Sequence, residues 1–182
     1  KIKYLSDMGC VNVGLGIESG SERIRDEVIV KPKFSNKQAI EVINCFKKYG
    51  IAVTAYNIIG FPTETTKDIL ETIDLNFKAK PNYSTVSYFQ PWEGTSLKDS
   101  SLKNGYLEEK KITDDTMQGQ QGGSLLKLDT INYGELQHFH DFFTYYIKLP
   151  KFFHKLIKRC AENKFLSFVF FKISDFLIKV KN

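Results

Sequence analysis

Alternation of apolar and polar positions over residues 11–17 predicts a β-strand. One face of this strand is branched and apolar, while the other face carries Asn12, Gly14, Gly16 and Glu18, because strand side chains point alternately to the two sides. Such a strand is typical of a parallel sheet with helices on one face and a ligand space on the other. Residues 51–59 and 82–90 predict two further strands.

Helical periodicity and capping residues predict helices between and after these strands. Residues 39–49 carry an apolar stripe at helical spacing, and Ser35 with Gln38 supplies a capping box before it. Ser19 with Glu22, Thr65 with Asp68, and Asn132 with Glu135 mark other helix starts. The predicted helices cover residues 1–8, 19–28, 35–49, 65–78, a short stretch from 96, 132–150, and two segments within 150–180.

The order of these elements indicates the fold. Residues 1–105 read as a helix end followed by three strand–helix units, which predicts an α/β fold with a parallel sheet and right-handed crossovers. Residues 106–127 are polar and glycine-rich, and residues 128–182 are mostly helical. We therefore expect two parts, the strand–helix units in 1–105 and a helical C-terminal extension in 106–182.

Three unusual loops follow the three strands, namely GIESGS, GFPTET and QPWEGT. Ligands of parallel α/β folds lie at the carboxyl ends of the strands, so the loops predict one rim around one pocket, although each could also be a good turn with a helix cap. Glu18 would accept hydrogen bonds from a ligand or cap a helix. A flat apolar ligand could lie on Ile58 and approach Gly60, unless both belong to the core. Capping is favoured for Glu64 and Thr65.

Composition narrows the chemistry. The three cysteines, Cys10, Cys45 and Cys160, lack the spacing of a metal site or a disulfide framework, which favours a reducing, cytoplasmic compartment. His138 and His140 are two residues apart in a helix and point in different directions. No residue is assigned as catalytic or as a metal ligand.

A dinucleotide-binding fingerprint is the rival interpretation of the first loop. Gly14, Gly16 and Gly20 are spaced as GxGxxxG after a strand, but the required acidic residue should end the next strand about 20 residues on. The predicted helix 35–49 occupies that region, so this interpretation is disfavoured.

The strings GCVNVGLGIESGSERIRDE, YGIAVTAYNIIGFPTETTKDILETI and YFQPWEGTSL together resemble the latter half of a radical S-adenosylmethionine (SAM) enzyme. The resemblance covers residues 1–105 and is strongest to the subgroup that often carries a cobalamin-binding domain, such as anaerobic magnesium-protoporphyrin monomethyl ester cyclase. It implies a partial TIM-like barrel in which these are the fourth, fifth and sixth strands.

The resemblance also implies site residues for SAM. Glu18 would lie near the ribose and amino-acid part, and Ile58 and Gly60 would pack the adenine. The family pattern GxIxGxxE would place its glutamate at Thr63, whereas this chain has Glu64. Lys31, or its competitor Lys33, would meet the SAM carboxylate, and Gln90 and Pro91 would offer backbone atoms to adenine. The cofactor-binding set is thus Gly14, Gly16, Glu18, Lys31, Ile58, Gly60, Gln90 and Pro91.

The CxxxCxxC loop that holds the family's [4Fe-4S] cluster is not in this sequence. The resemblance therefore implies the C-terminal part of a radical SAM enzyme, inactive alone, whose missing N-terminal half would hold the cluster and complete the barrel. The whole would generate a 5′-deoxyadenosyl radical to modify an unknown small-molecule or lipid-like substrate, and cobalamin is an optional further cofactor. A non-catalytic half-barrel that binds an adenine nucleotide is the alternative.

The positive charge is concentrated in the tail: residues 148–182 hold nine Lys or Arg and two acidic residues, or +7, whereas the whole chain has a net charge of +5. Residues 165–180 are too short and too charged for a transmembrane span. They would pack on the missing half of the protein, or lie on an anionic membrane surface as a peripheral, membrane-associated interaction segment. A nucleic-acid partner is not expected, because arginine is scarce there and no RNA-binding motif appears.

Overall fold

The computed structural model describes residues 1–30, 33–108, 123–160, 166 and 170. Its centre is a parallel sheet of three strands in the order β1-β2-β3: β1 (Asn12–Glu18), β2 (Ala52–Ile59) and β3 (Tyr83–Tyr88). Gly16 of β1 lies opposite Tyr56 of β2, which in turn lies opposite Thr85 of β3. The three predicted strands and their parallel arrangement are therefore confirmed.

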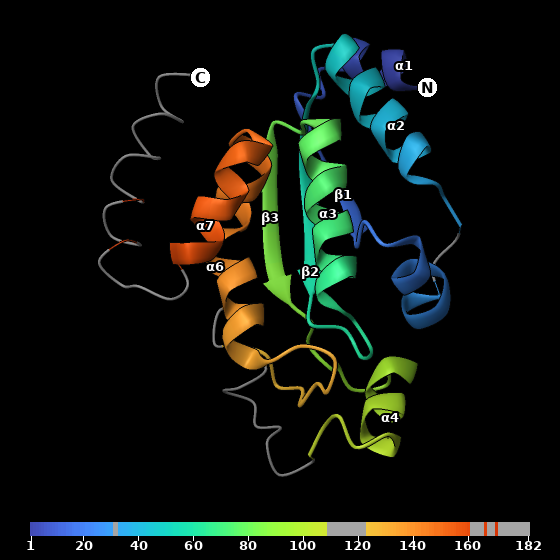
Figure 1. Cartoon of the computed structure of the whole chain (residues 1–182). Coiled ribbons are helices and arrows are strands. Elements are labelled where there is room, and N and C mark those ends of the chain that lie inside the picture. Colours follow the sequence, from blue (N-terminus) through green and yellow to red (C-terminus); the bar gives the residue numbers. More distant parts are fainter. Residues whose placement is uncertain (31–32, 109–122, 161–165, 167–169, 171–182) are drawn as a thin grey trace.

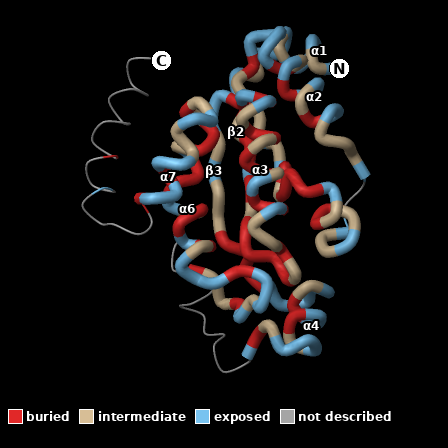
Figure 2. Tube along the Cα trace, in the orientation of Figure 1, coloured by how far each residue is buried: buried red, intermediate tan, exposed pale blue. Residues whose placement is uncertain are grey.

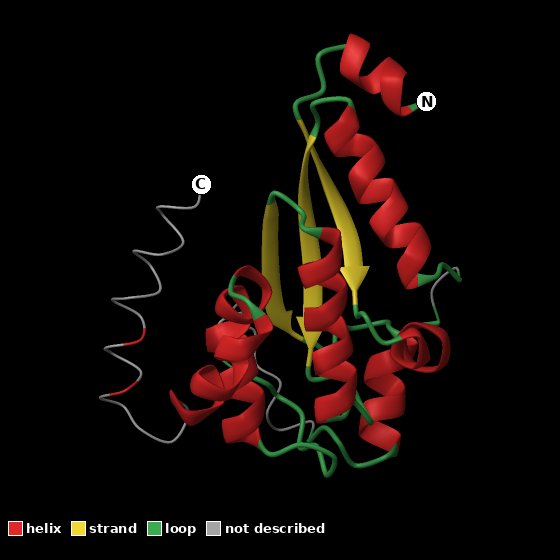
Figure 3. Ribbon diagram, turned by 45° about the horizontal axis from the view of Figure 1, so that its top comes forward, coloured by secondary structure: helices red, strands yellow, loops and turns green. Residues whose placement is uncertain are grey.

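Helices cover one face of this sheet and leave the other open (Figures 1 and 3). Those on the covered face are α2 (Asn36–Lys48), α3 (Thr66–Ala79) and α6 (Tyr133–Lys148). The remaining elements are α1 (Ile2–Asp7), the π-helix η1 (Ile24–Ile29), α4 (Ser96–Lys103), the 3-10 turn η3 (Lys151–Phe153) and α7 (His154–Cys160). The fold is α/β with a helical C-terminal region, as expected for a partial TIM-like barrel.

Most of the predicted helix starts are confirmed by their caps. Ser35 and Gln38 form the capping box of α2, and Thr65 and Asp68 form that of α3. Ser19 and Glu22 do not form the predicted capping box. The Ser19 hydroxyl accepts from the backbone of Ser21 at 3.1 Å, and Glu22 Oε1 accepts from the backbone N–H of Asn36 at 2.9 Å. Glu22 thus serves the start of α2, and η1 begins later than the predicted helix.

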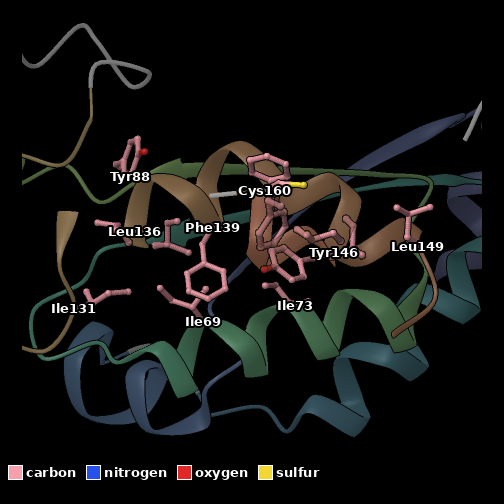
Figure 4. Packing of buried hydrophobic residues seen from close by; sticks show 14 of the residues in the cluster. Ile69, Ile73, Tyr88, Ile131, Leu136, Phe139, Tyr146, Leu149 and Cys160 are labelled. Carbon is pink, nitrogen blue, oxygen red and sulfur yellow. The ribbon is translucent and has the colours of Figure 1, made fainter. Parts of the chain in front are cut away.

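Two hydrophobic clusters lie between the sheet and its helices. One joins β1 and β2 to α2, with Val53, Ala55 and Ile43 at its centre. The other joins α3, α6 and the ends of β2 and β3, and Figure 4 shows its aromatic and aliphatic side chains. A third cluster lies at the carboxyl ends of the strands and contains Ile24, Phe61, Phe89, Leu107 and Leu126. Burial is thus concentrated on the helix side and at the carboxyl ends of the strands (Figure 2).

The predicted tail helix at 165–180 lies outside the described residues, except for Leu166 and Phe170. Phe170 is buried, with its ring centroid 6.0 Å from that of Phe142 and 5.4 Å from that of Tyr145. Among the described residues, no helix combines the length and apolarity needed to cross a membrane.

Candidate functional site

The chain segments that follow all three strands line one hollow of about 470 Å³. Val30 comes from the segment after β1, Thr63 from the loop after β2, and Ser96 and Asn104 from α4 after β3. The backbone N–H of Phe89 donates to the Ile59 carbonyl at 2.8 Å, which keeps the continuation of β3 beside that of β2. The segments after the three strands therefore share one hollow at this edge. Of the three predicted loops, only GFPTET contributes to its lining, through Pro62 and Thr63.

Glu18 ends β1 in a strained backbone conformation. Its φ is +64°, and the N–H of Ser19 donates to the Ile17 carbonyl at 2.9 Å across it. The pairing of β1 with β2 shifts register between Gly16 and Glu18. A non-glycine residue in a three-residue turn of this kind stores strain, and such residues cluster at functional sites. Glu18 is partly buried at the carboxyl edge, where the sequence placed it.

The loop after Glu18 is fixed against α3. The α-carbon of Gly20 lies so close to this helix that an added Cβ would come within 2.4 Å of the Glu71 carbonyl oxygen and of the Thr72 α-carbon. The Gly20 N–H donates to the Thr72 hydroxyl at 2.8 Å. Gly20 is therefore required by packing.

The Asp68 carboxylate of α3 accepts hydrogen bonds from side chains that follow β1. Ser21 Oγ donates to Asp68 Oδ1 at 2.6 Å, and Arg23 donates to Oδ2 at 2.7 Å. Burial would raise the pKa of Asp68, but hydrogen bonds from Arg23, Ser21 and Thr65 outweigh it and hold the pKa well below its usual range. Asp68 is thus a permanent anion that ties the first loop to the start of α3.

Arg25 ties the same loop to the start of α2. Its side chain is 2% exposed and donates to the carbonyls of Ser19 and Phe34, at 2.5 and 3.0 Å, and to Asn36 Oδ1 at 2.9 Å. The guanidinium also lies 4.3 Å from the centroid of the Phe34 ring. Arg25 was not among the predicted site residues, and Asp68 was predicted only as a helix cap with Thr65. The pairing of Asp68 with Ser21 and Arg23 joins segments more than 40 residues apart, which no local pattern indicates.

Glu64 closes the loop after β2. It is fully buried, and its Oε2 accepts from the backbone N–H groups of Gly60, at 2.5 Å, and Phe61, at 3.3 Å. Its Oε1 is buried without a hydrogen-bond partner among the described residues. Burial raises the pKa of Glu64 to about 8, against the lowering effect of the two backbone donors. The Gly60 N–H is therefore already used within the loop.

The predicted residues on the strands lie on the open face. An added Cβ at Gly14 would come within 2.8 Å of Tyr56 Cε2, so the Tyr56 ring occupies the room expected above Gly14. Ile58 packs against the cluster at the carboxyl ends of the strands, and Gly60 has Leu136 beside its α-carbon. The ligand contacts of these residues stay predictions.

Gln90 and Pro91 are both buried just beyond β3. Gln90 is 6% exposed, and neither its side-chain nitrogen nor its oxygen has a hydrogen-bond partner among the described residues. Such a buried amide is unusual, because buried polar groups are nearly always paired. Lys31 lies outside the described residues, and Lys33 is exposed, with its Nζ 3.8 Å from Asp26 Oδ2.

The described residues suit an organic cofactor better than a metal cluster. The unpaired amide of Gln90 and the strained Glu18 could hold an adenosyl group and its polar substituents. In contrast, no group of three or more His, Cys, Asp or Glu residues in the described part of the chain could hold a metal ion. All three cysteines are free thiols. A [4Fe-4S] cluster therefore does not fit these residues.

Comparison with known proteins gives a family match over part of the chain. Residues 1–75 match the family model described as the Radical SAM superfamily. The matched segment covers 75 of the 182 residues of this chain. It includes β1, β2 and most of α3, and therefore Glu18, Gly60 and Glu64.

Several curated proteins are similar to part of this chain. An uncharacterized methyltransferase of Pyrococcus horikoshii is 31% identical over 105 residues, which are 58% of this chain and 22% of the relative. A tRNA-2-methylthio-N(6)-dimethylallyladenosine synthase of Sulfurihydrogenibium sp. is 28% identical over 124 residues, or 66% of this chain and 28% of the relative. An uncharacterized protein of Methanocaldococcus jannaschii is 39% identical over 70 residues, covering 38% of this chain and 15% of the relative. The chain thus spans about a quarter or less of each of these relatives. The cyclase-like subgroup and the cobalamin stay predictions.

Proposed function

We propose that this chain is part of a radical SAM enzyme and that SAM lies at the carboxyl edge of its sheet. The observation that carries the proposal is Glu18, a carboxylate held in a strained turn at the end of a glycine-bearing strand, within the segment that matches the superfamily. An ionised carboxylate is an acceptor only, so Glu18 would bind ribose hydroxyls or the amino group of SAM.

Gln90 supports the adenine end of this proposal. A buried amide offers one donor group and one acceptor side by side, which is the pattern that pairs with the N7 and N6 atoms of adenine. Occupation by adenine would satisfy both unpaired atoms of Gln90. The same argument covers the alternative, a non-catalytic module that binds an adenine nucleotide.

When bound, SAM supplies an adenosyl group for radical chemistry. The role of the described residues is to bind and orient it, since they offer no ligand set for the [4Fe-4S] cluster. The sheet has only three strands in the described chain, so other parts of the protein would complete the barrel and hold the cluster. The names of the relatives favour methyl or methylthio transfer to an organic substrate as the reaction class.

SAM binding and cleavage by the full-length protein test this function. After anaerobic reconstitution, Glu18→Gln should weaken SAM binding about tenfold or more, because a hydrogen bond to a charged group contributes about 1.5–3 kcal/mol. Gln90→Leu should weaken it as well. Glu41→Gln is the matched control, because Glu41 is exposed on α2, and should leave the affinity unchanged.

The outcomes separate the alternatives. SAM binding with release of 5′-deoxyadenosine supports the enzyme. Binding of adenine nucleotides without any SAM cleavage by the full-length, reconstituted protein would instead indicate the non-catalytic module. If wild-type protein binds neither, the proposal is wrong.

A further inference from the structure

The open face of the sheet is polar and aromatic but carries no charge over most of its length. On this face β1 contributes Asn12, Gly14 and Gly16, β2 contributes Thr54, Tyr56 and Ile58, and β3 contributes Tyr83, Thr85 and Ser87. Helices α2, α3 and α6 pack on the opposite side (Figure 3), while Ile58 at the carboxyl end packs against residues of η1 and α4. The open face is therefore a surface on which a ligand can lie.

Tyr56 is the central side chain of this face. It lies in register between Gly16 on β1 and Thr85 on β3, and it is 51% exposed. Its ring leans across β1 over Gly14, since Cε2 lies 2.8 Å from the position that a Gly14 Cβ would take. Aromatic rings packed over a glycine of the neighbouring strand are a known device for fixing such a side chain. Gly14 therefore holds a place for the Tyr56 ring.

The Tyr56 ring is thus fixed in orientation while much of its surface is exposed. About half of Tyr56 is exposed, and the described residues offer its hydroxyl no hydrogen-bond partner and its ring no stacked aromatic neighbour. Thr54, Thr85 and Ser87 surround it with hydroxyl groups that can donate or accept. A charged ligand group would lose hydration here without meeting an opposite charge.

We infer that Tyr56 is the substrate-facing platform of this protein and selects a substrate whose reacting part is a planar, uncharged, heteroaromatic ring. The inference rests on the proposed function, because the open face would then line the interior of the completed barrel beside the SAM edge. The ring of the substrate stacks on Tyr56, and the neighbouring hydroxyls hydrogen-bond to its heteroatoms.

A planar probe tests this role in the full-length protein. Indazole, a neutral bicyclic ring with one donor and one acceptor, is titrated against protein saturated with SAM and against protein without SAM. Cyclohexanecarboxamide serves as a non-planar probe of similar size. Tyr56→Leu should weaken indazole binding about threefold to tenfold, the range expected for one aromatic contact. Tyr56→Phe, which keeps the ring, should change it less than twofold.

Tyr83→Leu is the matched control, because Tyr83 is 62% exposed on the same face, one row towards the amino end of β3. It should leave the indazole affinity unchanged. Gly14→Ala should also weaken indazole binding, because its new Cβ displaces the Tyr56 ring. The loss should be smaller than in Tyr56→Leu, because the ring is still present. Thermal unfolding of each variant verifies that the protein is folded.

Several results would overturn the inference. These are no indazole binding to wild type, equal loss in the Tyr56 and Tyr83 variants, or equal binding of the non-planar probe. Self-association that Tyr56→Leu abolishes would show that a second copy occupies the face. The proposed function has its own test, and it fails if the wild-type protein does not bind SAM. In that case the indazole affinities of the Tyr56 variants, measured without SAM, still test the role of Tyr56.

Discussion

At the residue scale, two carboxylates four positions apart have opposite electrostatic environments. Asp68 receives donors from Ser21, Arg23 and Thr65, and its pKa is held low. Glu64 is enclosed by apolar surroundings with two backbone donors on one oxygen, and its pKa is raised to about 8. The two side chains should therefore affect stability in opposite pH ranges.

Glu64 makes the folded state less stable as the pH rises. Its folded-state pKa of about 8 lies above the ordinary value of 4.5, so the folded chain binds this proton more tightly than the unfolded chain does. The contribution is complete below pH 4.5 and is lost as the pH rises through about 8. Glu64→Gln, which keeps an acceptor for the Gly60 N–H and cannot ionise, should show a smaller fall in the free energy of unfolding between about pH 5 and about pH 8.

Urea unfolding of both proteins at the two pH values measures this difference. Glu41→Gln, an exposed glutamate on α2, is the control and should follow wild type. Parallel pH profiles for wild type and Glu64→Gln would show that Glu64 is not the titrating group.

At the element scale, the close contact of the β1 loop with α3 depends on Gly20. Gly20→Ala should lower the free energy of unfolding by about 1–3 kcal/mol or more, the range for overpacking, because its Cβ would meet backbone atoms that cannot move independently. Chemical denaturation of the folded chain measures the loss.

Gly134→Ala is the matched control, because Gly134 lies in the first turn of α6 and its new Cβ would meet only the Asn132 side chain at 3.5 Å. It should be neutral or stabilising by up to about 1 kcal/mol, since alanine is the better helix former. A Gly20 variant as stable as this control would contradict the packing argument.

Local patterns in the sequence were sufficient to predict the strands and the capped helices. Alternation, helical periodicity and caps depend on residues a few positions apart, as in the Ser35–Gln38 box. The roles of Gly14 and Gly20 could not be predicted in this way. Each is set by a distant segment, the Tyr56 ring for Gly14 and the α3 backbone for Gly20. Gly14 was interpreted as room for a ligand, and this ligand contact stays a prediction. The structure adds that the Tyr56 ring lies beside Gly14.

Features of the candidate site that depend on distant segments could not be predicted from the sequence either. Parallel strands place their carboxyl ends at one edge, so the segments after the three strands could be expected to lie near one another. The single rim formed by GIESGS, GFPTET and QPWEGT stays a prediction, because the hollow at this edge is lined by only the second of these loops. The buried state of Glu64 and the unpaired amide of Gln90 follow from how those loops pack, and the sequence contains no local signal for either.

At the scale of the whole molecule, the helical extension and the strand–helix units share one hydrophobic cluster. Ile59, Ile69 and Ile73 of the first part contact the same cluster as Phe139, Phe142 and Phe143 of α6. Figure 4 shows α6 lying against α3, with Ile69, Ile73 and Phe139 between them. The division at residue 105 marks a change of secondary structure, and the shared cluster favours one cooperative unit across it.

Phe143→Ala tests whether the two parts unfold together. Phe143 is almost fully buried in the shared cluster, so its truncation should cost about 3–5 kcal/mol, while Phe152→Ala, at an exposed position, should change stability by less than about 0.5 kcal/mol. Unfolding is followed both by the fluorescence of Trp92, which lies before residue 105, and by far-ultraviolet circular dichroism. Coincident transitions shifted equally by Phe143→Ala would show one cooperative unit. If only the dichroism transition moved and Trp92 did not respond, residues 1–105 would fold independently of α6.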